Sequence, residues 1–351
     1  VATALASSAL LLAAASPLLF TVLTGPSAEA VPAGVPSYDP GEYVEDHYPR
    51  DVNEAVTVTV DGQAGEAQLV AFQRRIAAID GLEPGTPFVR ASRDVAYANF
   101  AADRPALAQR PQDAVGELRG LAPPGATSVL VSGNTARFVD QKQSIVDHLP
   151  LVVGIVALTT LAILFMLTGS VLLPIKTLLM NVLTLGATLG VIVLAFQEGW
   201  LDGVFGYAGP EAIEVTSLVF LFAVIFGLAT DYAVLVMARI KEFHDAGYSN
   251  EEAVATGIGR TGRVITAAAV MIAVVFLAFG VSSVFFMKQI ALGVAFGVLL
   301  DATVVRALLV PALMRLFGEW NWWAPGPLRR LHLRFGIREG ESEPAPANAG
   351  G

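Results

Sequence analysis

The sequence predicts a polytopic α-helical membrane protein with six spans and one large α/β domain outside the hydrocarbon. Of its 351 residues, 54% are hydrophobic and only 15% are charged, whereas soluble chains carry about 25% charged residues. The missing charge is concentrated in apolar stretches of about 20 residues, the length that crosses a hydrocarbon core about 30 Å thick. Because lipid offers no hydrogen-bond partners to the backbone, these stretches must be helices.

The predicted spans are residues 3–23, 149–168, 171–196, 213–238, 264–286 and 288–316. The first has an alternative interpretation as a signal peptide, because Ala28-Glu29-Ala30 resembles a signal-peptidase site. We favour a span, residues 1–24, because the apolar run is long and no basic residues precede it. The chain starts at Val1 rather than Met, and we interpret it as a fragment.

Basic residues gather on one side of the predicted bundle, which sets its orientation. They are Lys176, Arg239, Lys241, Arg260, Arg263, Arg315, Arg329, Arg330, Arg334 and Arg338. The opposite loop, residues 197–214, holds four acids and no base, and Lys288 is the exception on that side. Since basic loops stay inside, we expect a multi-pass protein of the inner membrane with a cytoplasmic C-terminus and residues 25–147 extracytoplasmic.

The segment 25–147 has the pattern of an independent α/β domain. Its predicted elements are strands at 55–60, near 86–90 and at 127–133, with helices at 64–79 and from Pro111 to Leu121. The strands alternate in polarity or end at turn residues, the first helix has apolar residues at helical spacing, and Pro111 suits position N1. The order β-α-β-α-β predicts a sandwich of the split-βαβ, ferredoxin-like type.

The remaining chain divides into a five-span bundle, 148–318, and a cytoplasmic tail, 319–351. Within the bundle, Ser249 or Asn250 can cap a short helix near 249–260 that we expect to lie along the membrane surface. Three tryptophans after the last span predict an interfacial anchor, and the composition beyond about residue 340 predicts disorder.

Charged residues inside the predicted spans are the candidate functional group. They are Asp231, followed by Tyr232, in the fourth span, and Asp301 with Arg306 in the sixth. A charge at the bilayer centre costs at least about 2.5–3.5 kcal/mol on insertion scales, so we expect all three charges to face the bundle interior or a wet cavity. A proton relay is one interpretation, and a static Asp301–Arg306 ion pair that pins two helices is the alternative.

Other classes of site are disfavoured. A net charge of −9 argues against nucleic-acid binding, and the chain has no cysteine and no histidines at metal-ligand spacing. Residues 257–262 match the dinucleotide fingerprint, but no strand precedes them and a span follows. No P-loop is present. We therefore expect no cofactor, no metal and no enzyme activity.

Four stretches together resemble a known family, the mycobacterial membrane protein large (MmpL) group of the resistance-nodulation-division superfamily. They are SGNTARFVD (132–140), TDYAVLVMARIKE (230–242), GIGRTGRVITAAAVMIAVVF (257–276) and LLDATVVRALLVPALMRLFGEWNWW (299–323). The resemblance covers about residues 1–335 and implies the C-terminal half of a transporter, with 25–147 as its porter domain. Leu235 departs from the aromatic residue that the family commonly has there.

This resemblance implies export of lipids or other hydrophobic compounds, driven by the proton-motive force. It further implies that Asp231, Tyr232, Asp301 and Arg306 relay protons, together with a missing N-terminal half or a second copy of the chain. Two alternatives remain: multidrug efflux of the same superfamily, and a non-transporting module that binds or senses lipid. A sensor would not need a titrating carboxylate at the depth of Asp231.

Overall fold

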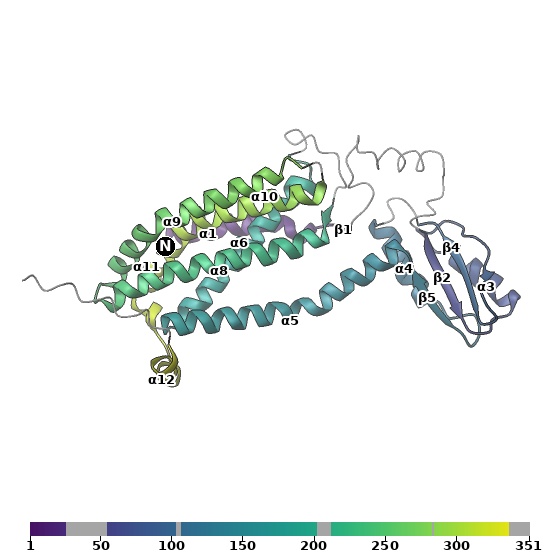
Figure 1. The fold of residues 1–351 in the computed structure, drawn as a ribbon, viewed down its shortest axis with the longest axis horizontal. Helices are drawn as coiled ribbons and strands as arrows, with labels where there is room; N and C mark the ends of the chain where they lie inside the picture. Colours follow the sequence, from purple (N-terminus) through teal and green to yellow (C-terminus); the bar gives the residue numbers. More distant parts are fainter. Residues whose placement is uncertain (26–54, 103–106, 202–211, 283, 337–351) are drawn as a thin grey trace, which may run out of the picture.

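The computed structural model describes residues 1–25, 55–102, 107–201, 212–282 and 284–336. They form a bundle of long helices and a separate sheet domain, joined by one long helix, α5 (Figure 1). The end of the bundle nearer the sheet domain is called the domain end below, and the opposite end the far end.

Six helices in the described residues are long and apolar enough to cross a membrane, as predicted. They are α1 (Ala2–Ala15) continued by η1 (Ser16–Phe20), α5 (Asn134–Thr168), α6 (Leu172–Ile192) continued by η3 (Val193–Gln197), α8 (Val215–Asp245), α9 (Asn250–Phe279), and α10 (Phe285–Leu300) continued by η4 (Asp301–Leu309), α11 (Val310–Phe317) and η5 (Gly318–Trp322). The third and sixth spans are 56% buried and α5 and α9 only 17%. The third and sixth spans therefore form the centre of the bundle.

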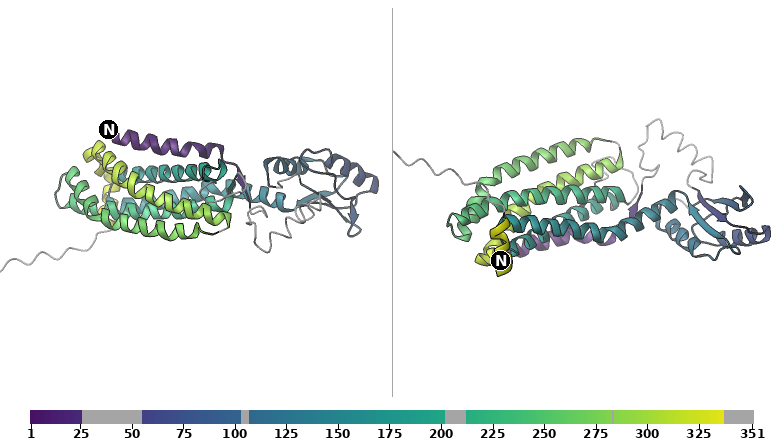
Figure 2. Two further views of the ribbon diagram at one scale, coloured as in Figure 1. Left: turned by 90° about the horizontal axis from the view of Figure 1, so that it is seen from above. Right: turned by 60° about the horizontal axis from the view of Figure 1, so that its bottom comes forward.

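Glycines let these central helices approach closely. A Cβ at Gly190 on α6 would overlap the carbonyl oxygen of Ala14 on α1. A Cβ at Gly293 on α10 would meet the Leu221 side chain of α8. Small residues at interfaces are the usual means of packing helices in lipid, where no hydrophobic force draws them together. Figure 2 shows α1 lying along the bundle beside the other spans.

The sheet domain has four antiparallel strands in the order β3-β4-β2-β5. Its elements are β2 (Val56–Asp61), α3 (Glu66–Ile76), β3 (Val89–Arg90), β4 (Val95–Phe100), α4 (Gln109–Gly120) and β5 (Ser128–Ser132). The succession β-α-β-β-α-β is the split-βαβ, ferredoxin-like arrangement. The predicted architecture is therefore correct, although strand β4 was not predicted and Pro111 is the third residue of α4, not the first.

Alternation builds the core of this domain. Val56, Val58 and Val60 of β2 are fully buried, while the threonines between them are only partly covered. Phe72 of α3 and Val115 of α4 pack in the same core. Both helices therefore cover one face of the sheet. This agrees with the period-two apolar pattern of the strands and the helical spacing of apolar residues in the helices.

Helix α5 runs without interruption from the sheet domain into the membrane bundle (Figure 1). It starts at Gly133, whose φ of 120° favours glycine and whose added Cβ would overlap the carbonyl oxygen of Ala55 beside β2. Pro150 lies near its middle. Proline lacks the amide for one helical hydrogen bond, so we expect α5 to bend there.

A cluster of hydrogen-bonded polar side chains around Asn321 lies at the far end of the bundle. The Lys176 ammonium of α6 donates to the Asn321 side-chain oxygen, and Asn321 Nδ2 donates to the Met314 carbonyl at 2.7 Å. Asn250 at the start of α9 accepts from Trp322 Nε1 at 3.2 Å. Trp322 is thus part of the packing, whereas Trp320 and Trp323 are exposed, as an interfacial anchor would be.

A two-residue ladder ties the domain end of the bundle together. β1 (Leu23–Thr24), which follows the first span, pairs in parallel with β6 (Ile213–Glu214), which precedes α8. The buried Glu214 carboxylate caps α8, accepting from the backbone amides of Thr216 and Ser217 at 3.0 and 2.7 Å. An acid at a helix N-terminus satisfies otherwise unpaired amides.

The expected surface helix near 249–260 is not a separate element. Ser249 does cap it, with Glu252 completing a capping box, but the helix continues as α9 through the fifth span. Nothing in the sequence there breaks a helix, because no proline occurs between 250 and 279. The dinucleotide-like residues 257–262 lie inside α9, which confirms that they are not a phosphate-binding turn. The tail beyond residue 336 lies outside the described residues.

We predict that Gly190→Val destabilises the bundle by about 1–3 kcal/mol, as overpacking does, since α1 and α6 must separate to admit the side chain. Gly154→Val is the matched control, because no atom lies within 4 Å of an added Cβ there. The measurement is the thermal unfolding midpoint of each variant in detergent. Equal midpoints for the two variants would contradict the close α1–α6 packing.

Candidate functional site

The sixth span widens into a π-helix at Asp301. This segment, η4, begins at Asp301 and contains Arg306. Residues five apart in an α-helix point about 140° away from each other, whereas a π-helix joins residues i and i+5 by its hydrogen bonds. The widening therefore brings Asp301 and Arg306 onto one face of the span. Such π segments frequently occur at functional sites.

Asp301 and Arg306 form a buried ion pair in the middle of the bundle. Arg306 Nε donates to Asp301 Oδ2 at 2.8 Å, and the side chains are 6% and 2% exposed respectively. A second guanidinium nitrogen of Arg306 donates to the carbonyl oxygen of Ala229 on α8. The pair thus joins the sixth span to the fourth, as the static interpretation of this pair requires.

Tyr232 of α8 lies beside this ion pair. The Arg306 guanidinium lies 5.8 Å from the centre of the Tyr232 ring, within the range of a cation–π contact. Neither the Tyr232 hydroxyl nor Asp301 Oδ1 has a hydrogen-bond partner among the described residues, although both atoms are buried. Buried polar atoms nearly always have partners, so these two atoms are exceptional within the described bundle.

Asp231 lies elsewhere. It is exposed on the outer surface of the described bundle, while the adjacent Tyr232 is buried. Consecutive residues of an α-helix point about 100° apart, and here this places Tyr232 inside and Asp231 outside. The expectation that Asp231 faces the bundle interior is wrong for these six spans alone.

Asp231 belongs to an exposed stripe along α8 that includes two small residues. The stripe recurs every four residues through Ala223, Gly227, Asp231 and Leu235. No atom of the described chain lies within 4 Å of an added Cβ at Gly227. Small residues four apart are typical of surfaces where two membrane helices meet.

Sequence reasoning missed a polar face on α6 that adjoins the ion pair. Asn181 Nδ2 donates at 3.1 Å to the hydroxyl of Thr230, the residue after Ala229. Thr177, Thr184 and Thr188 continue the same buried face. Their spacing of three or four residues in an otherwise apolar span is the signal that could have found them.

Comparison with known proteins identifies the family. The model of the MMPL family matches residues 92–340. The chain belongs to the MMPL family. It is 46% identical over 247 residues to a membrane protein of Streptomyces coelicolor, covering 70% of this chain and 34% of that one.

Two other relatives of this MMPL chain carry functional names. The trehalose monomycolate exporter MmpL3 of Mycobacterium tuberculosis is 38% identical, with 78% of this chain and 30% of that protein covered. The mycolic acid-containing lipids exporter MmpL11 of Mycolicibacterium smegmatis is 37% identical, with 61% and 22% covered. The chain thus spans about a third or less of these relatives. A solved structure of a heavy metal efflux pump is 14% identical with a TM-score of 0.49, covering 75% of this chain and 36% of that one.

With six candidate spans and this family membership, the MMPL chain is a multi-pass membrane protein. Its relatives are named as exporters rather than enzymes. No group of three or more metal-ligating side chains occurs among the described residues.

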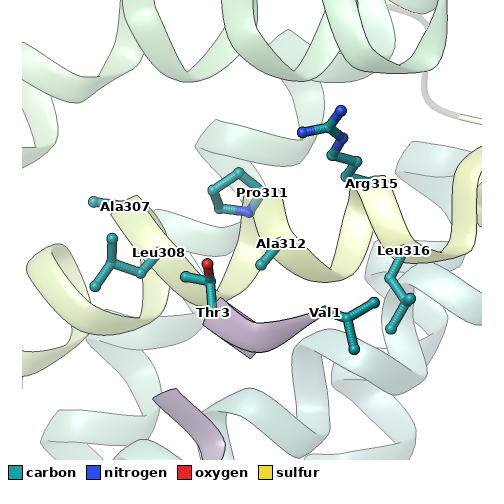
Figure 3. A pocket seen from close by; sticks show the side chains of 8 residues that line it. All are labelled: Val1, Thr3, Ala307, Leu308, Pro311, Ala312, Arg315 and Leu316. Carbon is teal, nitrogen blue, oxygen red and sulfur yellow. The ribbon is translucent and has the colours of Figure 1, made fainter. Parts of the chain in front are cut away.

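A cavity of about 550 Å³ opens between the first and last spans of the MMPL chain (Figure 3). It is lined by Val1, Thr3, Ala307, Leu308, Pro311, Ala312, Arg315 and Leu316. Arg315 is its single charged side chain, and its guanidinium Nε bonds the exposed Glu251 carboxylate at 3.1 Å. None of the four predicted relay residues lines this cavity, so it is separate from the buried ion pair.

We predict that Arg306→Met destabilises the bundle by about 3–5 kcal/mol, because it leaves the Asp301 charge buried without a partner. The double variant Asp301→Leu/Arg306→Met removes both charges and should recover most of the loss. Unfolding of the purified chain with increasing denaturant in detergent measures both. A double variant that is no more stable than Arg306→Met alone would mean that the two residues are not coupled as described.

Proposed function

We propose that this chain is the proton-coupling half of an exporter that moves lipids or other hydrophobic compounds across the inner membrane, driven by the proton-motive force. The observation that carries the proposal is the group of Tyr232, Asp301 and Arg306, buried in the middle of a bundle whose family relatives are named as lipid exporters. Each proton that enters gains about 2.3 kcal/mol per 100 mV of membrane potential.

Asp301 and Asp231 have different roles in this proposal. Asp301 keeps one oxygen on Arg306 and has the other free to take a proton. Protonation removes the charge that Arg306 balances, which weakens the link between the fourth and sixth spans and lets them shift. Asp231 exchanges protons at the outer surface of α8, where a second half or a second copy of the chain covers it.

The need for a covering partner follows from the cost of exposure. An uncovered carboxylate at mid-membrane depth costs at least about 2.5–3.5 kcal/mol. The small residues Ala223 and Gly227 on the same stripe allow another helix to approach α8 closely. The partner we propose is the segment that corresponds to the other half of the relatives, or a second copy.

In the proposal the sheet domain is extracytoplasmic and the far end of the bundle faces the cytoplasm. This orientation agrees with the basic residues at the far end. The sheet domain receives or passes the substrate. Since α5 is continuous, a displacement of the sheet domain reaches the bundle directly.

We predict that Asp231→Asn in the native gene product abolishes lipid export, because an amide cannot carry a proton. Asp245→Asn is the matched control: it lies on the same helix, is exposed at the far end and pairs with Lys241. The measurement is labelled lipid at the cell surface, with protein level and membrane insertion checked for both variants. Lipid export and drug efflux that both persist in Asp231→Asn would rule out the relay. Loss of drug efflux with unchanged lipid export would identify a multidrug pump.

We also predict that Gly227→Leu abolishes export without changing the thermal unfolding midpoint of this chain. No atom of the described chain lies within 4 Å of an added Cβ there, so we expect the side chain to project outward and to block the approach of a helix to α8. Gly259→Leu, in α9 and equally uncrowded, is the control and should export normally. Normal export by Gly227→Leu would mean that no helix packs on this stripe.

A further inference from the structure

The last described helix, α12 (Gly326–Phe335), has an apolar face and a basic face. At about 100° per residue, Leu328, Leu331 and Phe335 share one side of the helix. Arg330 and Arg334 lie on the opposite side, and Arg329 lies on its flank. A short helix with this distribution is typical of segments that lie in a membrane surface.

The structure holds α12 at the level where the spans leave the hydrocarbon. The His332 ring lies 6.0 Å from that of Phe165 in the last turn of α5, edge to face. In Figure 1 the spans run along the horizontal while α12 is seen almost down its own axis, so it lies across the bundle direction. The exposed Trp320 and Trp323 just before it mark the same boundary.

Both sides of α12 are largely exposed in the described chain. Leu331 and Phe335 are 43% and 57% exposed. The ion pairs among the described residues do not include Arg329, Arg330 or Arg334, and the Arg334 guanidinium lies 5.3 Å from the centre of the neighbouring Phe335 ring. Three guanidinium groups without a carboxylate partner among the described residues are notable in a chain whose net charge is −9, and they favour a negatively charged partner.

We infer that α12 lies in the membrane surface at the far end and binds the anionic headgroups of phospholipids through Arg329, Arg330 and Arg334. Its apolar side enters the boundary of the acyl chains, and the guanidinium groups reach the phosphates, which they can contact with two parallel hydrogen bonds. An anionic lipid surface fits better than an acidic protein, because the apolar side of α12 lies at the level of the bilayer boundary.

The experiment uses the absence of cysteine from the chain, which allows single-site labelling. Leu331→Cys and Leu333→Cys place a spin label on the apolar side and on the other side of the same helix. Each labelled chain is reconstituted in nanodiscs of phosphatidylcholine alone, or of equal parts phosphatidylcholine and phosphatidylglycerol. Collision with a water-soluble nickel chelate and with lipid-soluble oxygen reports the depth of each label.

We expect the label at 331 to be shielded from nickel in the anionic discs and more accessible in the neutral discs, while the label at 333 stays accessible in both. Replacing Arg329, Arg330 and Arg334 by Gln should remove the difference in shielding between the two lipids. Each replacement is expected to weaken the binding of α12 to the anionic surface about fivefold. Because the described ion pairs include none of these arginines, the thermal unfolding midpoint should stay unchanged.

Two outcomes would overturn the inference. Equal shielding at 331 in both lipids, unchanged by the glutamine replacements, would mean apolar contact without headgroup binding. Accessibility of 331 to nickel in every disc would mean that α12 stands off the bilayer and that its apolar side faces a protein. Neither outcome bears on proton-driven export, because α12 is remote in sequence from Asp231 and Asp301.

Discussion

Burial of a charge pair in an apolar bundle is the constraint on which this structure depends. A carboxylate and a guanidinium removed from water must hold each other and find further partners, or the bundle loses more than their attraction supplies. Asp301 and Arg306 meet this requirement through a local change of helix type and through the Ala229 carbonyl of a neighbouring span. The helices around them pack closely through glycines.

The requirement is met only in part, and the remainder suggests function. A purely structural pair would have every buried polar atom satisfied. Here one Asp301 oxygen and the Tyr232 hydroxyl have no partners among the described residues. On the outside of α8, Asp231 is likewise exposed at a position inside a candidate span. An ion pair that pins two spans and a site that titrates are therefore compatible descriptions of the same residues.

The sequence was sufficient for features that rest on composition and on period. Six apolar stretches gave six spans, and the alternation of β2 gave its buried face. It was insufficient where tertiary geometry decides. The orientation of Asp231 depends on which face of α8 packs inward, and the π-helix at Asp301 has no local sequence signature. The polar cluster around Asn321 links this residue to Lys176 and Asn250, which are 145 and 71 positions away in the sequence. No pattern within a single sequence connects residues so far apart. Strand β4 (VAYANF) was missed because Ala96, Ala98 and Asn99 are residue types that are depleted in strands.

The continuous path of α5 has a mechanical consequence. A helix of 35 residues that is capped inside one domain and packed inside another has no joint at the boundary between them. Twisting the sheet domain about this helix must either turn the membrane segment by the same angle or be absorbed as bending at Pro150. The stiffness of α5 at Pro150 therefore determines how much of a rotation of the sheet domain reaches the membrane bundle.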